Sequence, residues 1–140
     1  MTNGKELKQF YVGCKQIQAW PADKNAYGVE YEDGYVSQSP KGVFDRHYLA
    51  MGEDSTKISP AMVNSFIAKV EVATLGDGRT TLVQATLRNG FTITETSTCV
   101  DIKNYDEGVG KSLCMIKVED RVWELLGFML CWAKNGLSHE

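Results

Sequence analysis

The feature that most constrains the fold is one long helical pattern in the C-terminal third of the chain. It runs from about Asp106 to Asn135 and ends at Gly136, a residue suited to the left-handed conformation that closes many helices. Its first half is amphipathic, with apolar residues near helical spacing at Val109, Leu113, Ile116 and Trp123. From Val122 onward it is apolar nearly all round. Such a helix must be covered on several sides, by a sheet of the same chain or by another subunit, and in so short a chain we favour a subunit interface.

Three alternating runs precede this helix and predict an antiparallel meander of three strands. Residues 69–75, 80–87 and 91–100 are rich in β-branched side chains, and turn sequences separate them. The second turn, Asn89-Gly90, is the strongest short-range signal for a hairpin. Upstream of the meander, Ser59-Pro60 is a start signal for a short helix, because serine caps helices and proline suits the first helical position.

The first third of the chain reads as a small β-rich module. Residues 9–20 have strand-forming character, and we expect Trp20-Pro21 to end that strand. Asp33-Gly34 then lies between two short aromatic and β-branched runs, which indicates a hairpin.

A second short helix is expected directly after this hairpin. Ser39 is predicted to cap it and Pro40 to occupy its first position, with the helix continuing over residues 41–50. The polar segment 51–58 is the best candidate for a linker. We therefore expect an N-terminal hairpin-and-helix module over residues 1–52. A helix, the meander and the long helix follow over residues 58–140, and the two parts are small enough to form a single domain. The fold class is α+β, oligomeric through its helices.

Composition excludes several classes of function. The formal net charge of -3 disfavours a broad basic surface for long nucleic acid. No run reaches the roughly 18 apolar residues of a membrane span. The four cysteines form no CxxC pair, and no secretory signal precedes them, so we expect reduced thiols in a cytosolic protein.

Catalytic and metal-binding motifs are weak in this sequence. The two histidines, His47 and His139, stand in no metal-ligand spacing. Cys99 has Asp101 nearby and could lie at a helix N-terminus, which would activate a thiol, but alternation favours a packed residue at the end of a strand. No phosphate-binding loop or dinucleotide fingerprint is present. We expect no catalytic residue, no metal and no cofactor.

The junction "ETSTCVDIKNYDEGVG" at residues 95–110 leaves two interpretations open. A helix N-terminus offers free N–H groups to an anion, Asn104 can read a base edge or a hydroxyl, and Arg121 lies on a later turn. Asp106 and Glu107 would repel a phosphate there and are typical of a helix cap. Local sequence alone favours the cap over ligand binding.

Ordered motifs carry a resemblance further than the chemistry does. A "TTL…NGF" hairpin, a "CVD…NYDE…G" strand-to-helix junction and a tryptophan in the terminal helix make residues 58–137 resemble a family of small tailed-phage proteins. The upstream "YEDGYVSQSPKGVF" is similar to a second phage module, although Gln38 stands where that pattern usually has tryptophan. Together the two modules resemble the first class of Thoeris anti-defence sponges.

The resemblance implies a function in the host bacterial cytoplasm. Such sponges bind a cyclic ADP-ribose isomer (gcADPR) without cleaving it, and some assemble further and take up cyclic di- or trinucleotides of CBASS signalling. It also implies a homo-oligomer, from a dimer up to a hexamer. For gcADPR we expect Arg121 at the pyrophosphate, Asn104 at a base or ribose, Phe91 as a stacking surface and Thr94 in the pocket wall. For a second, assembly-dependent pocket we expect three basic residues: Lys41, Arg46 and Arg88.

Two alternatives to a sponge remain open. One is a cyclic-nucleotide hydrolase, or a hydrolase that uses Cys99. The other is a structural or host-takeover phage protein that acts by protein contact through the apolar face from Val122 to Trp132.

Overall fold

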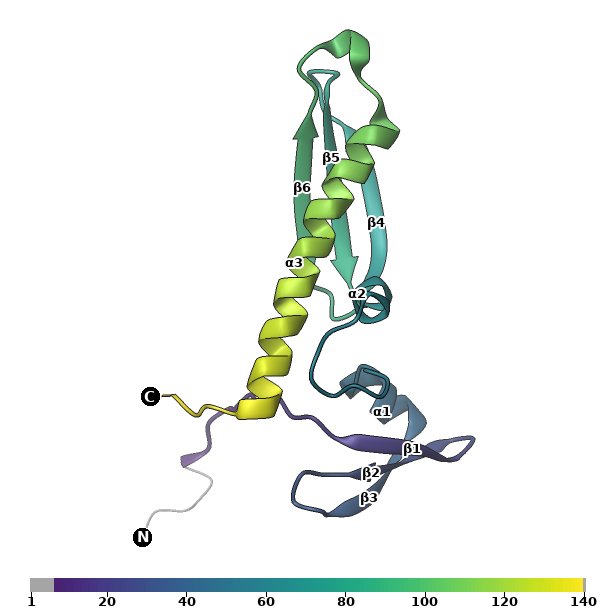
Figure 1. Cartoon of the computed structure of the whole chain (residues 1–140), viewed down its shortest axis with the longest axis vertical. Coiled ribbons are helices and arrows are strands. Elements are labelled where there is room, and N and C mark those ends of the chain that lie inside the picture. Colours follow the sequence, from purple (N-terminus) through teal and green to yellow (C-terminus); the bar gives the residue numbers. More distant parts are fainter. Residues whose placement is uncertain (1–6, 140) are drawn as a thin grey trace. The chain divides into compact units, whose positions relative to one another are not determined.

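The computed structural model describes residues 7–139 and confirms an α+β fold with two three-stranded antiparallel sheets and a long C-terminal helix (Figure 1). The chain divides into two compact units. Residues 49–128 form one, here called the sheet–helix unit; the residues up to Tyr48 and from Met129 onward form the other, here called the N-terminal unit.

The sheet of the sheet–helix unit is the predicted meander. Strands β4 (Ile67–Thr74), β5 (Thr80–Leu87) and β6 (Thr92–Thr98) are hydrogen-bonded in that order and are antiparallel. The expected turns join them. Gly78 and Gly90 have φ of 70° and 89°, a left-handed backbone that glycine adopts without strain. The central strand β5 buries alternate residues, as a strand covered on one face should.

The long helix α3 (Glu107–Asn135) covers one face of this sheet (Figure 1). Gly136 follows it with φ of 62°, which confirms the predicted end. The helix buries a row in which every fourth residue is apolar: Cys114, Val118, Val122 and Leu126, none more than 3% exposed. This row meets the buried face of β5, which presents Thr81, Val83, Ala85 and Leu87.

The apolar row read from the sequence is a different one. Val109, Leu113, Ile116 and Trp123 are 57%, 47%, 56% and 38% exposed. Two apolar rows therefore run along α3, and periodicity alone identified the outer one. The core row escaped notice because it begins at Gly110 and Cys114, which carry little hydrophobic signal.

The short helix α2 (Pro60–Phe66) begins as predicted. The backbone N–H of Met62 donates to Ser59 Oγ at 3.2 Å, and Pro60 occupies the first turn. Met62 and Val63 are each 2% exposed, so this turn of helix contributes to the core.

The N-terminal unit contains β1 (Gln18–Asp23), β2 (Ala26–Glu30), β3 (Val36–Pro40) and α1 (Lys41–His47). The hairpin at Asp33-Gly34 is confirmed, with β2 and β3 paired antiparallel. Two details of the sequence reading were wrong. Trp20-Pro21 does not end a strand but lies within β1, an edge strand in which a missing proline N–H costs no ladder bond. Pro40 is the N-cap residue of α1, and Ser39 stays in β3 opposite Tyr27, so no side chain caps this helix.

Candidate functional site

The strand-to-helix junction is held by the hydroxyl of Tyr105. This oxygen lies 2.7 Å from Thr74 Oγ1 on β4 and 2.9 Å from Thr81 Oγ1 on β5. Thr74 Oγ1 also donates to Glu107 Oε2 at 2.7 Å. One aromatic side chain thus joins two strands to the first turn of α3.

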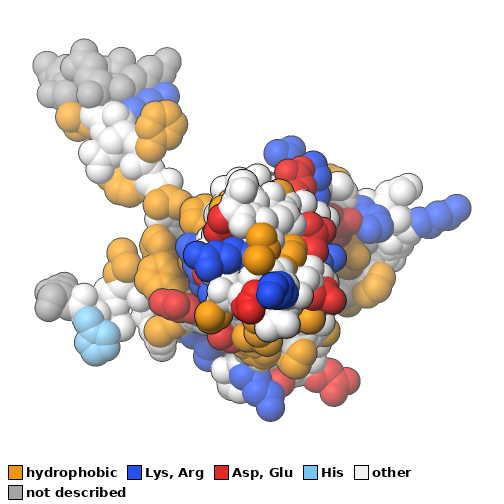
Figure 2. All heavy atoms as spheres, turned by 90° about the horizontal axis from the view of Figure 1, so that it is seen from above, with side chains coloured by type: hydrophobic (Ala, Val, Ile, Leu, Met, Phe, Trp, Pro, Cys, Tyr) orange, Lys and Arg blue, Asp and Glu red, His pale blue; other side chains and the backbone are white. Residues whose placement is uncertain are grey.

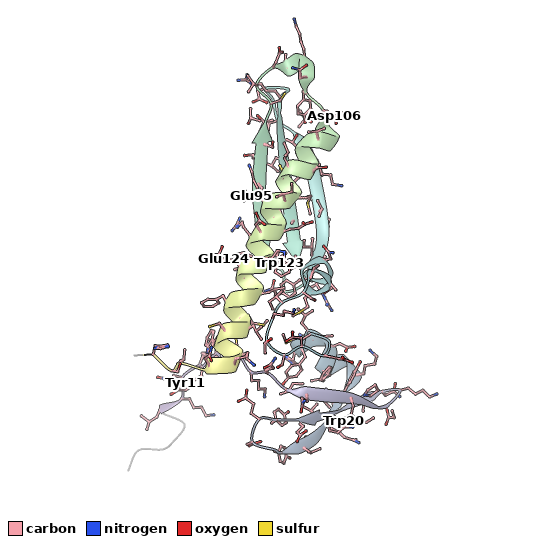
Figure 3. The ribbon with its side chains drawn as sticks, viewed as in Figure 1. Tyr11, Trp20, Glu95, Asp106, Trp123 and Glu124 are labelled. Atoms are coloured by element: carbon pink, nitrogen blue, oxygen red, sulfur yellow. The ribbon has the colours of Figure 1, made fainter. Side chains whose placement is uncertain are left out.

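Asp106 is the cap of α3, which confirms the cap interpretation of this junction. Its Oδ1 accepts from the backbone N–H of Val109 at 3.1 Å, and its carbonyl oxygen accepts from Gly110 at 3.0 Å. Figure 3 shows Asp106 at the N-terminal end of the helix. Because two carboxylates already lie in this turn, it is unfavourable for a phosphate.

A small hollow of about 120 Å³ lies beside the junction, between the last residues of β6 and the first turns of α3. Its wall includes Arg79, Ser97, Cys99 and Asn104. Arg79 is engaged, since its Nη1 donates to the carbonyl of Val100 at 3.1 Å. Asn104 uses its backbone N–H to bond Asp101, which leaves its side-chain amide to face the hollow or solvent.

A row of charged groups lies where α3 passes along β6. Arg121 Nη1 lies 3.4 Å from Glu95 Oε2, with the two side chains 46% and 22% exposed. One turn earlier, Lys117 Nζ donates to the carbonyl oxygen of Thr96 at 2.7 Å. Figure 3 shows Glu95 on β6 beside the helix. We call Glu95, Lys117 and Arg121 the charged seam.

The charged seam is the part of the site that sequence reasoning missed in two of its three members. Lys117 and Glu95 were read as ordinary polar residues. The available signal was the alternation of β6, which puts Glu95 on the same face as buried Ile93 and hence against the helix. A carboxylate at an inward position indicates a cationic partner.

The other predicted residues of this unit lie elsewhere on the sheet. Thr94 pairs with exposed Gln84, on the face opposite the helix. Phe91 is 50% exposed at the start of β6, whereas Asn104 follows its end, a separation of roughly 20 Å along the strand. Arg88 lies at the Phe91 end, where its backbone N–H donates to Phe66. A single copy therefore brings Arg121 to β6 but leaves Phe91 and Asn104 at opposite ends of it.

Lys41 and Arg46 both lie on α1 in the N-terminal unit. Lys41 Nζ is 2.7 Å from Asp45 and 5.8 Å from the centre of the Tyr27 ring. The hydrogen bond to Asp45 raises the pKa of Lys41, so it stays protonated. Tyr27 stacks on Phe44 at 4.2 Å, which makes an aromatic surface beside a cation. Arg46 is exposed in the last turn.

The reactive-cysteine alternative finds little support in the geometry. Cys99 Sγ lies 3.1 Å from the carbonyl oxygen of Asp101, an acceptor that favours the thiol over the thiolate. Both histidines of the chain belong to the N-terminal unit, whereas Cys99 belongs to the sheet–helix unit. Burial raises the pKa of the Cys114 thiol, so this cysteine is a core residue.

Metal and membrane sites were also sought. Residues 7–139 contain no group of three His, Cys, Asp or Glu side chains placed to hold a metal ion. No helix in this part of the chain is long and apolar enough to cross a bilayer. On the face shown in Figure 2, acidic, basic and apolar side chains are intermixed.

Comparison with known families matches residues 58–133, more than half of the chain, to the phage protein (N4 Gp49/phage Sf6 gene 66) family. The chain belongs to this phage family. The match spans α2, the meander, the junction and most of α3, including Asn104 and Arg121, and stops short of Lys41 and Arg46. No curated protein and no solved structure matches the chain. What the family membership adds is a phage origin for this fold, without an activity.

Proposed function

We propose that this phage protein binds and sequesters a cyclic ADP-ribose isomer, gcADPR, in the cytoplasm of the host bacterium without cleaving it, and so blocks Thoeris signalling. The resemblance of both sequence modules to Thoeris sponges motivates the proposal. The observation that carries it is the charged seam. There a half-exposed guanidinium and an ammonium one helical turn apart can meet the two charges of a pyrophosphate.

A complete site requires more than one copy of the chain. The hollow at the junction is about 120 Å³, whereas pockets for ligands of this size are about 300 Å³ or larger. Asn104 and Phe91 also lie too far apart in one chain to contact one small ligand. We therefore propose a homo-oligomer in which the base-stacking and ribose-binding groups come from different copies.

The aromatic surface of α1 favours a second ligand class. Lys41 beside the stacked rings of Tyr27 and Phe44 resembles the cation-and-ring combination that binds single-stranded nucleotides. We propose that cyclic di- or trinucleotides bind there once the oligomer brings several such surfaces together. Arg46 and Arg88 would supply further charge.

Titration calorimetry with gcADPR tests the main proposal. We expect tight binding that Arg121→Ala weakens at least tenfold, because a charge-assisted contact to phosphate is lost. Lys111→Ala is the matched control: it removes an exposed cation from the same helix, outside the seam, and should leave affinity unchanged. Heating the complex should release intact gcADPR. Absence of binding by the unmodified protein, or release of a linear product, would refute sequestration.

Titration with cyclic trinucleotides tests the second ligand class separately. Lys41→Ala should weaken their binding and leave gcADPR binding unchanged. If neither ligand binds, contact with a host protein becomes the better explanation.

A further inference from the structure

The outer face of α3 carries a heptad pattern. Val109, Leu113, Ile116 and Trp123 are spaced by four, three and seven residues, and Asp120 and Gly127 fill the remaining positions of the same repeat. The four apolar side chains are 38–57% exposed. Cys114, Val118 and Val122 meet the sheet on the opposite side of the helix, so this outer row is free of the unit's own core.

We propose that this row is the contact surface for a second copy of the chain, with the two α3 helices antiparallel. Charge decides the direction. In a parallel pair the heptad would place Asp120 against the partner's Asp120, and Glu119 against the partner's Glu124. Like charges at these positions are destabilising. An antiparallel pair removes both clashes.

Charge also selects one antiparallel register. Flanking positions of the row are occupied by Lys117 and Glu124, both exposed. Of the three registers that keep the apolar positions facing each other, one opposes Lys117 to the partner's Lys117 and another opposes Glu124 to the partner's Glu124. The third places Lys117 opposite the partner's Glu124, and two-fold symmetry makes this pair twice.

In the third register the large and small residues of the row also match. Ile116 lies opposite the partner's Gly127, where the missing side chain leaves room. Trp123 lies opposite the partner's Asp120, and the indole N–H can donate to that carboxylate. Figure 3 shows Trp123 and Glu124 at adjacent positions of α3. The row is thus complementary to itself, as a two-fold interface requires, which favours a second copy over an unrelated partner.

Sedimentation equilibrium of the full chain, with circular dichroism to verify folding, tests the interface. The unmodified protein should be a dimer. Ile116→Asp should raise the dimer Kd at least a hundredfold, because it places two charges in the centre of the contact. Val100→Asp is the matched control, since Val100 is 92% exposed on a loop outside the row, and it should leave the Kd unchanged.

Charge reversal tests the register. Glu124→Lys should raise the Kd about tenfold at low salt, since two attractive pairs become repulsive. Lys117→Glu combined with Glu124→Lys should restore it to within about threefold. A monomeric wild type would overturn the proposal. Tighter association of Glu124→Lys would show a parallel pair instead, and an unchanged Kd would show that the two residues do not meet. The inference does not depend on gcADPR: a dimer that binds no ligand would refute only the proposed function.

Discussion

Gly110 marks the closest approach between α3 and the sheet, and its replacement by alanine is a demanding test of the fold. A Cβ at this position would overlap Thr81 Oγ1 and lie 2.7 Å from Thr81 Cβ. Thr81 is fully buried and its hydroxyl bonds Tyr105, so it cannot turn away without losing that bond. Helix and strand must therefore separate locally to accept one methyl group.

The magnitude follows from two opposing effects. Alanine is favoured over glycine inside a helix by about 0.5–1 kcal/mol. Overpacking a rigid contact typically costs about 1–3 kcal/mol, and here the displacement is at the upper end. We expect Gly110→Ala to lower the free energy of unfolding by about 2 kcal/mol.

Gly127 in the same helix is the matched control. A Cβ built there meets nothing within 4 Å, so Gly127→Ala should be stabilising by about 0.5–1 kcal/mol. Both variants should be measured by urea unfolding followed by circular dichroism, in the Ile116→Asp background so that association does not contribute. If Gly110→Ala is as stable as its parent, the close packing of α3 against Thr81 is wrong.

Two further predictions concern the same unit. Tyr105→Phe removes the hydroxyl shared by Thr74 and Thr81 and should lower the free energy of unfolding by about 1–2 kcal/mol in the same urea assay; an unchanged stability would show that the hydroxyl does not hold the junction. The hydrogen bond from the Thr80 hydroxyl, followed by that from the Arg79 backbone, lowers the pKa of Asp77 from 3.8, so the ionised form stabilises the fold. That contribution is present above pH 3.8 and is lost as pH falls through the lowered value; thermal melting should therefore show a steeper acid loss for the wild type than for Asp77→Asn, and parallel acid profiles would contradict it.

The sequence predicted well those elements whose signals are local. Asn89-Gly90 specifies a hairpin by backbone conformation alone, and the hydroxyl of Ser59 needs only the N–H three residues later. The core row of α3 could not be found in this way. Two rows of similar spacing share the helix, and only the sheet decides which is buried, because close approach at Gly110 requires the absence of a side chain.

The candidate site shows the same division. Asn104 was identified from the junction, where helix termini and polar side chains have local signatures, and it lines the hollow beside that junction. Glu95 and Lys117 gain their importance from a strand and a helix that meet only in the folded unit. The aromatic and basic residues Phe91, Lys41 and Arg46 are at separate places in one chain, so neither pattern nor monomer geometry specifies how they would combine.

The junction motif that identifies the family is explained almost entirely by folding. Tyr105 ties two strands together, Asp106 caps the helix, Glu107 accepts from Thr74, and Gly110 permits the close contact with β5. A match to this motif therefore reports the architecture of the unit and says little about its ligand. Asn104 differs from these four, because the junction uses only its backbone. Binding specificity within such a family must come from side chains that the fold does not need, and Asn104 together with the exposed guanidinium of Arg121 meets that condition.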